Sequence, residues 1–261
     1  MSEPAFDKVR FEAEARTRGL SFGRPLTWQD ETQSTNDDAL VAAKSGAPHG
    51  AVFGAEAQTR GRGRRGSEWL SAPGAGLWFS VLLRPQLSPE QAPALALCAG
   101  LAVRAAAATR VAANVGVKWP NDVLAGGRKL AGILVESQIS GARLGGVIVG
   151  VGINVTQQAF PDALSNIATS LQLLSANALG REQLLADVLS QLQALLGRLE
   201  ADGMASIAEA LRPHDALLGR RLRIEGVEGC GAGIDEAGRL LLRSDAAELR
   251  PIAAGHVELL D

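Results

Sequence analysis

An arginine- and glycine-rich segment, residues 60–66, places four guanidinium groups within six positions of the chain. Its three glycines loosen the backbone, so the segment can gather backbone amides and bidentate arginine donors around a phosphate or a carboxylate. Taken alone, these residues are also typical of a solvated turn or of an RGG-like nucleic-acid contact. The glycine spacing matches GxGxxG, but residues 67–74 continue as loop where a dinucleotide site needs a helix, so we reject a Rossmann interpretation.

A second cluster, Lys118-Trp119-Pro120-Asn121-Asp122, lies at the end of a predicted strand. An ordinary reverse turn explains the proline, the asparagine and the aspartate, but it requires neither the lysine nor the tryptophan. A lysine at a strand end can hold phosphate oxygens, and a neighbouring aspartate can bind Mg²⁺. The cluster therefore fits either a plain turn or a nucleotide site.

Two further polar residues stand at the ends of predicted strands. Lys129 directly precedes the apolar run 130–136, a common position for lysine that indicates little alone. Asn154 follows glycines that allow close backbone approach, and its amide either caps a turn or reads a base edge. The three histidines have no metal-ligand spacing and no Ser/Asp triad partners, so we assign them no catalytic role.

Hydrophobic periodicity predicts the elements that would position these residues. Ser34, Thr35 and Asn36 favour the start of a helix, and Gly46 favours its end. After Pro213, short apolar runs alternate with glycine-containing turns, which indicates a small all-β module. The other predicted elements are strands at 51–56, 77–83, 115–119, 130–136 and 147–151, and helices at 88–109, 181–200 and 204–211.

The composition bounds the classes of protein that remain. A chain of 261 residues with 46% hydrophobic and 21% charged residues can bury a sizeable core, which excludes a disordered or disulfide-stapled protein. The net charge of −2 gives no global attraction to nucleic acid or to an anionic membrane. Residues 92–103 are too few to cross a bilayer, and no apolar signal segment begins the chain. We therefore predict a cytoplasmic protein without a membrane partner.

A series of short motifs spans residues 31–154. In chain order they are Glu31-Thr32-Gln33-Ser34-Thr35-Asn36, Gln58, Gly61-Arg62-Gly63-Arg64-Arg65-Gly66, Lys118-Trp119-Pro120-Asn121-Asp122, Lys129-Leu130-Ala131-Gly132-Ile133-Leu134 and Val151-Gly152-Ile153-Asn154. Each is weak separately, but together their order and separations resemble the biotin protein ligase family, the biotin-[acetyl-CoA-carboxylase] ligases of bacteria.

The resemblance implies an α+β fold with two domains. Residues 1–212 would form a mixed sheet flanked by helices, a catalytic domain like that of class II synthetases and biotin ligases, and residues 213–261 a small SH3-like β-barrel. The roughly 30 residues before Glu31 are too few for the winged helix-turn-helix domain of bifunctional members, so we expect a monofunctional ligase without direct DNA binding. His256 stands where the family commonly has an acid, so the chain departs from the family pattern there.

The resemblance also implies a reaction and its residues. Members activate biotin with ATP and Mg²⁺ as biotinyl-5'-AMP and transfer it to a lysine of the biotin carboxyl carrier protein of acetyl-CoA carboxylase. The expected catalytic residues are Arg64, Lys118 and Lys129. The expected contacts are Ser34, Thr35, Asn36, Gln58, Arg62, Gly63, Arg64 and Lys129 for biotin, Arg64, Asn121 and Asn154 for the nucleotide, and Asp122 for Mg²⁺.

Two other functions stay open at this point. A lipoate or octanoate ligase would have the same fold and would also modify a carrier lysine, although the arginine segment and the cluster at 118–122 favour biotin. A nucleic-acid-binding module would use residues 60–66, although the net charge of −2 argues against it. The sequence is compatible with a monomer or a homodimer, and it leaves open which carboxylase subunit is modified.

Overall fold

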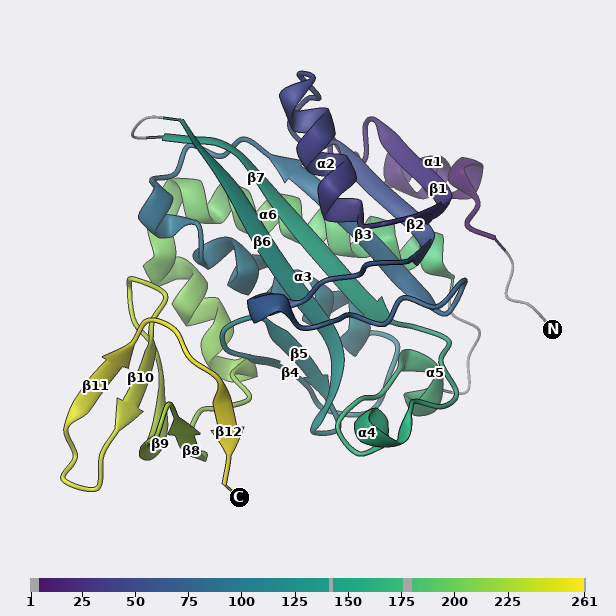
Figure 1. Ribbon diagram of the computed structural model, residues 1–261. Helices are drawn as coiled ribbons and strands as arrows, with labels where there is room; N and C mark the ends of the chain where they lie inside the picture. The colour runs from purple at the N-terminus through teal and green to yellow at the C-terminus, as the bar shows by residue number, and fades with distance from the viewer. Residues whose placement is uncertain (1–4, 141–142, 176–179, 261) are drawn as a thin grey trace.

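The large sheet of the computed structural model forms the centre of the protein (Figure 1). The structure describes residues 5–140, 143–175 and 180–260, without the side chains of residues 138–140 and 143–145. In sheet order, the strands are β1 (Leu26–Thr32), β2 (Val52–Gln58), β3 (Gly76–Leu83), β7 (Arg143–Asn154), β6 (Arg128–Ser140), β5 (Asp122–Ala125) and β4 (Val115–Lys118). Because β1 and β2 run parallel and all other neighbours run antiparallel, the sheet is mixed, as predicted.

Helices cover both faces of this sheet. Figure 1 shows α2 (Thr35–Lys44) on the near face and α3 (Ala94–Ala108) and α6 (Arg181–Leu211) behind it. Strand alternation explains both layers, since Leu82 packs in the small cluster under α2 while Leu83, the next residue, lies in the main core. The helical stretch Pro89–Ala108 is long and apolar enough to span a membrane, but 72% of it is buried inside the protein, as in a core helix.

A second sheet follows α6 and contains the strands β8 (Arg221–Ile224), β9 (Val227–Ile234), β10 (Leu240–Arg243), β11 (Leu249–Ile252) and β12 (Val257–Leu259). It is antiparallel, in the order β11-β10-β9-β8-β12, as expected of a small SH3-like domain. The indole Nε1 of Trp119 donates to the carbonyl of Gly238, 3.0 Å away, and thereby fastens the turn after β4 to this sheet. The hydrophobic core runs continuously from α6 into the second sheet, so the division after residue 212 stays a prediction.

Several elements differ from the sequence prediction. The helix predicted at 88–109 is interrupted, with a 3₁₀ turn at Pro89–Gln91 followed by α3. The two helices predicted at 181–200 and 204–211 are one element, α6, with a kink at Gly203, whose φ is 73°. Polar β1 and four-residue β5 escaped prediction because neither shows a long alternating pattern. The helices α1 (Lys8–Thr17), α4 (Asp162–Ser165) and α5 (Leu171–Leu174) were also missed.

A buried ion pair fastens the start of the described chain to the core. The Arg181 guanidinium lies 2.7 Å from the Glu56 carboxylate, and their side chains are only 5% and 12% exposed. The same carboxylate accepts hydrogen bonds from the backbone N–H of Phe6 and from Nε1 of Trp28. Burial alone would raise the pKa of Glu56, but these donors hold it below its ordinary 4.5.

We expect Glu56→Gln to lower the free energy of unfolding by about 3 kcal/mol at pH 7, because Arg181 stays buried without its carboxylate. Urea unfolding measures the change. Glu12→Gln, which breaks an exposed pair with Arg16, is the control and should change the value by no more than about 0.5 kcal/mol. Equal losses of unfolding free energy in the two variants would contradict a stabilising role for the buried pair.

The same pair predicts a pH dependence. Since the folded-state pKa of Glu56 is lowered, its contribution is complete above the ordinary value of 4.5 and is lost as the pH falls through the lowered pKa. The stability difference between wild type and Glu56→Gln should therefore shrink as acid is added below pH 4.5.

Candidate active site

A cavity of about 560 Å³ lies over the face of the large sheet that carries α2. Its lining comes from the start of α2, the end of β2, the arginine-rich segment, the turn between β4 and β5, and the strands β6 and β7. Residues 255–257 of the second sheet close one side. The segments that carried the sequence motifs therefore meet in one place.

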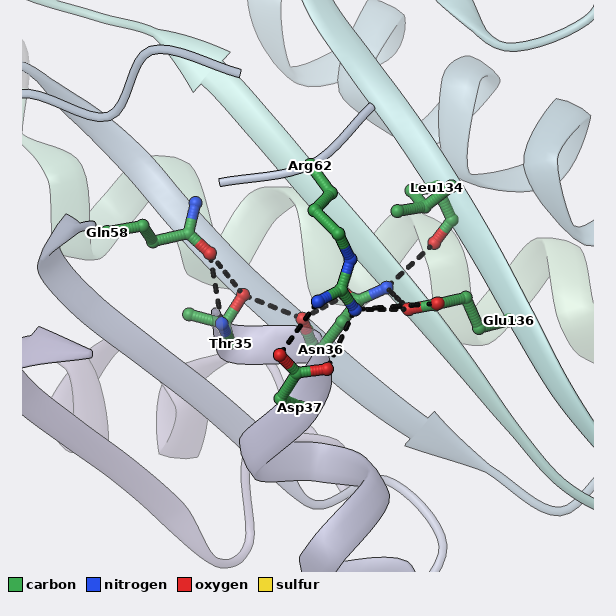
Figure 2. Close-up of polar contacts among 8 residues, drawn as sticks. Thr35, Asn36, Asp37, Gln58, Arg62, Leu134 and Glu136 are labelled. Atoms are coloured by element: carbon green, nitrogen blue, oxygen red, sulfur yellow. Dashed lines mark hydrogen bonds and ion pairs between the residues drawn. The ribbon is translucent and has the colours of Figure 1, made fainter. Parts of the chain in front are cut away.

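One end of the cavity is a hydrogen-bonded polar cluster (Figure 2). The backbone N–H of Thr35 donates to Oε1 of Gln58, 2.9 Å away. Oδ1 of Asn36 accepts from the fully buried Ser80 hydroxyl at 2.6 Å, while Nδ2 donates to Glu136 at 2.6 Å. A Cβ at Gly150 would come within 2.1 Å of Asn36 Oδ1, so glycine is required beneath it. The cluster presents fixed donors and acceptors to the cavity.

The other end of the cavity gathers cations around a short hairpin. Lys118 of β4 pairs in register with Asp122 of β5. Nζ of Lys129, at the start of β6, lies 2.8 Å from Oδ1 of Asp122. The Arg64 guanidinium donates to Oδ1 of Asn121 at 3.3 Å, and Nδ2 of Asn121 donates to the carbonyl of Ile133. The hairpin thus brings three cations to one wall.

Two of these cations lack a carboxylate of their own. Burial lowers the pKa of Lys118, and the charge of Lys129 lowers it further, while Asp122 partly opposes them. Burial likewise lowers the pKa of Arg64, with a contribution from Arg65. Within the described part of the chain, neither Lys118 nor Arg64 forms an ion pair. A bound anion would therefore relieve the cost of desolvating both.

Glycines of β6 and β7 form a flat floor under Trp69. A Cβ on Gly132 would lie 2.9 Å from the Trp69 ring, and one on Gly152 only 2.5 Å from its Nε1. Nζ of Lys129 stands 5.3 Å from the centre of the same ring, within reach of a cation–π contact. The indole Nε1 is buried without a hydrogen-bond partner, so the ring covers this part of the cavity at some cost.

The second sheet contributes to the rim. The Arg65 guanidinium donates to Oε1 of Glu225, 3.0 Å away, and the same oxygen accepts from the backbone N–H of His256. Both Arg65 and Glu225 have positive φ, 55° and 49°. His256 lines the cavity together with its two neighbours. The contact links the arginine-rich segment to the small domain.

The structure brings all but one of the predicted site residues to this cavity. Those that line it are Ser34, Thr35, Asn36, Gln58, Arg62, Gly63, Arg64, Lys118, Asn121, Asp122 and Lys129. Asn154 does not line it: it is 5% exposed, and its Nδ2 donates to the carbonyl of Thr169 at 2.9 Å. Sequence reasoning missed Asp37, Ser80, Glu136 and Glu225, because no motif marks them and only the fold brings them to the site. The individual ligand roles stay predictions.

The carboxylates of the cavity limit how Mg²⁺ could be bound there. Among the residues that the structure describes, no group of three or more His, Cys, Asp or Glu side chains could hold a metal ion. Asp122 contributes a single carboxylate to the cavity. In nucleotide sites Mg²⁺ is commonly held by one or two carboxylates together with substrate phosphates. The residues therefore fit an ion that arrives with a nucleotide.

Comparison with known proteins gives consistent results. The Biotin/lipoate A/B protein ligase family matches residues 28–154. The chain is 40% identical over 229 residues to the biotin-[acetyl-CoA-carboxylase] ligase of Mycobacterium tuberculosis, covering 84% of this chain and 83% of that one. It is 34% identical to the bifunctional ligase/repressor BirA of Bacillus spizizenii, covering 91% and 74%. The biotin protein ligase of Aquifex aeolicus, solved with biotin and ATP, matches with a TM-score of 0.78 and 28% identity, covering 92% and 99%.

We expect Gly152→Ala to displace the Trp69 ring from the cavity floor, because the new Cβ would overlap Nε1 at 2.5 Å. Tryptophan emission should then shift to longer wavelength as the ring becomes hydrated. Gly197→Ala in α6 is the control, since nothing lies within 4 Å of its added Cβ; it should leave the emission unchanged and raise the free energy of unfolding by about 0.5–1 kcal/mol. Identical spectra for the two variants would show that Trp69 does not rest on this glycine.

Proposed function

Because the chain belongs to the biotin/lipoate A/B protein ligase family, and within it to the biotin protein ligases, we propose that it activates biotin with ATP and attaches it to a lysine of a biotin carboxyl carrier protein. It is accordingly a carbon–nitrogen bond-forming ligase of the biotin-[acetyl-CoA-carboxylase] type. The observation that carries the proposal is one cavity with a polar cluster at one end and, at the other, the cations Lys118 and Arg64, which form no ion pair among the described residues.

In the first half-reaction an anion, the biotin carboxylate, has to approach a polyanion, ATP, against electrostatic repulsion. A carboxylate oxygen of biotin attacks the α-phosphorus of ATP, the bond to the leaving pyrophosphate breaks, and biotinyl-5'-AMP forms. One unit-charge pair at about 4 Å is worth about 4 kcal/mol at an effective dielectric near 20, so each cation in the site lowers the repulsion substantially. Lys129 would hold the carboxylate, while Lys118 and Arg64 would stabilise the charge that develops on the phosphate. Asp122 would hold the Mg²⁺ that neutralises phosphate charge.

The second half-reaction replaces AMP by an amine. A lysine of the carrier attacks the carbonyl carbon of the mixed anhydride, AMP leaves with the bridging oxygen, and the amine gives up a proton. Water competes for the same carbon, so the adenylate has to be covered until the carrier arrives. The arginine-rich segment and Trp69 line the cavity on one side and residues 255–257 line it on another, which supports their role as that cover.

The polar end of the cavity favours biotin over lipoate. A ureido group offers two N–H donors and one carbonyl acceptor, whereas the dithiolane ring of lipoate offers none. Thr35, Asn36 and Gln58 hold hydrogen-bonding groups of both kinds in fixed positions at that end, which suits a ureido group and offers an apolar dithiolane ring no complementary partner.

Nucleic-acid binding is disfavoured by the pairing of the arginine-rich segment. Arg62 and Arg65 already contact the carboxylates of Asp37, Glu136 and Glu225. The net charge of −2 supplies no compensating attraction.

We place the enzyme in the cytoplasm, where ATP is available.

The decisive assay follows pyrophosphate release and biotin transfer together, with purified chain, biotin, MgATP and a carrier domain. We expect both products, and no competition from lipoate. Transfer of lipoate in place of biotin would support the lipoate ligase alternative. If the folded chain forms neither product, ligase activity is refuted. Salt-sensitive DNA binding would then support the nucleic-acid alternative.

We expect Lys118→Met to slow pyrophosphate release about 10²- to 10³-fold with little change in the KM for biotin, because Lys118 acts on the phosphate in the transition state. Rapid-quench assays measure the effect, and Lys44→Met on the exposed end of α2 is the control. Burial lowers the pKa of Lys118 from its ordinary value of 10.5. As the pH is raised, the wild-type rate should therefore begin to fall before pH 10.5 is reached, because the ammonium loses its proton. A near-normal pyrophosphate burst from Lys118→Met would remove this residue from the reaction.

A further inference from the structure

Ser80 places a hydroxyl on the otherwise apolar strand β3. Every residue of this strand is buried, and strand alternation puts Ser80 on the face that carries α2, together with Leu82. Its oxygen has two partners at the start of that helix, Oδ1 of Asn36 at 2.6 Å and Oγ1 of Thr35 at 2.8 Å. Thr35 and Asn36 line the polar end of the cavity, whereas Ser80 lies outside the lining. A buried hydroxyl is costly unless it is hydrogen-bonded, so both contacts must share its one proton with those of its partners.

The neighbours of the Asn36 amide fix which of its ends carries the protons. Nδ2 lies 2.6 Å from Oε2 of Glu136 and 3.5 Å from the carbonyl oxygen of Leu134 (Figure 2). A carboxylate and a backbone carbonyl both accept, so the NH₂ end of the amide must face them. The carbonyl end, Oδ1, therefore faces Ser80 and can only accept. The single proton of the Ser80 hydroxyl is thus committed to Asn36.

The contact between the two hydroxyls then needs a proton from Thr35. Since the Ser80 proton is committed to Asn36, the 2.8 Å contact is a hydrogen bond only if the Thr35 hydroxyl donates to Oγ of Ser80. The other oxygen near this hydroxyl, Oε1 of Gln58, is farther away at 3.2 Å and already accepts from the Thr35 backbone N–H. The Thr35 hydroxyl therefore donates toward the sheet, and its lone pairs remain for a group in the cavity that it lines.

We propose that Ser80 is a positioning residue that orients the Thr35 hydroxyl as a hydrogen-bond acceptor for an N–H group of the biotin ureido ring. This inference rests on the proposed function for the identity of the ligand. An acceptor at this place binds an N–H group and discriminates against an oxygen atom, because two facing acceptors have no proton to share. Ser80 acts through Thr35, and Asn36 fixes the direction in which Ser80 donates.

Cyclic carbamate analogues of biotin, in which an oxygen atom replaces one ureido N–H, test this acceptor. Isothermal titration calorimetry without ATP gives the Kd of biotin and of each of the two regioisomers. We expect the wild type to bind one regioisomer about 100-fold more weakly than biotin. In Ser80→Ala the Thr35 hydroxyl can turn and donate to the ring oxygen, so the ratio of the carbamate Kd to the biotin Kd should fall about 10-fold.

The ratio of the two Kd values separates positioning from a general structural role. If Ser80 only supports the fold, Ser80→Ala should weaken both ligands by the same factor and leave the ratio unchanged. In Thr35→Val, which removes the hydroxyl on which Ser80 acts, the ratio should be low whether or not Ser80→Ala is also present. Ser45→Ala is the control, because it removes an exposed hydroxyl that donates to the carbonyl of Val41 at the other end of α2, and it should leave both Kd values as in the wild type.

Neutron diffraction from deuterated crystals of the wild type locates the same protons without a ligand and without a variant. We expect the deuteron between the two hydroxyls to be bound to Oγ1 of Thr35, and the deuteron directed at Asn36 to be bound to Oγ of Ser80. A Thr35 deuteron directed at Gln58 would overturn the proposal, and so would an unchanged Kd ratio in Ser80→Ala. If the wild type binds no biotin, the proposed function fails, while the neutron map still decides whether Ser80 orients the Thr35 hydroxyl. The map also decides this point if Ser80→Ala does not fold.

Discussion

Crowded positive charge is the constraint on which this site depends. Lys118, Lys129, Arg64 and Arg65 lie along one cavity, and burial together with mutual repulsion lowers the pKa of both Lys118 and Arg64. Acids neutralise only part of this charge, Asp122 at Lys129 and Glu225 at Arg65. The desolvation cost left at the other two cations is recovered when an anion binds. This arrangement favours the binding of anionic ligands.

The fold keeps these charges in place by short-range geometry. The β4–β5 hairpin sets Lys118 opposite Asp122, and the adjacent start of β6 brings Lys129 to the same carboxylate. Trp119 at the hairpin turn fastens the second sheet, whose residue Glu225 then reaches Arg65. The small domain thus helps to position the arginine-rich segment through one indole and one carboxylate. The hydrophobic core is also continuous between the two sheets.

The order and separations of the motifs predicted most of the cavity lining, but not the contacts that organise it. The glycine, lysine and Ser-Thr-Asn motifs are each weak separately, and they predicted the lining only through their joint resemblance to the biotin protein ligases. Glu136 and Glu225 escaped notice because an acid on a strand or turn is ordinary, and only long-range packing gives it a partner. Asn154 shows the converse case, since this residue of a motif lies outside the cavity lining and bonds the carbonyl of Thr169, so its nucleotide role stays a prediction. Polar β1 joined the sheet because parallel pairing with β2 outweighed its weak strand signal.

The proposed function depends on one step, in which the cations of this cavity allow a carboxylate to attack the α-phosphate of ATP. Biotin labelled with ¹⁸O in its carboxyl group tests it directly. If the attack occurs at the α-phosphorus and a carrier lysine then displaces AMP, mass spectrometry of the AMP from one turnover will find one ¹⁸O atom. Unlabelled AMP, or label in inorganic phosphate with ADP as the other product, would contradict the claim, because the carboxylate would then have attacked elsewhere.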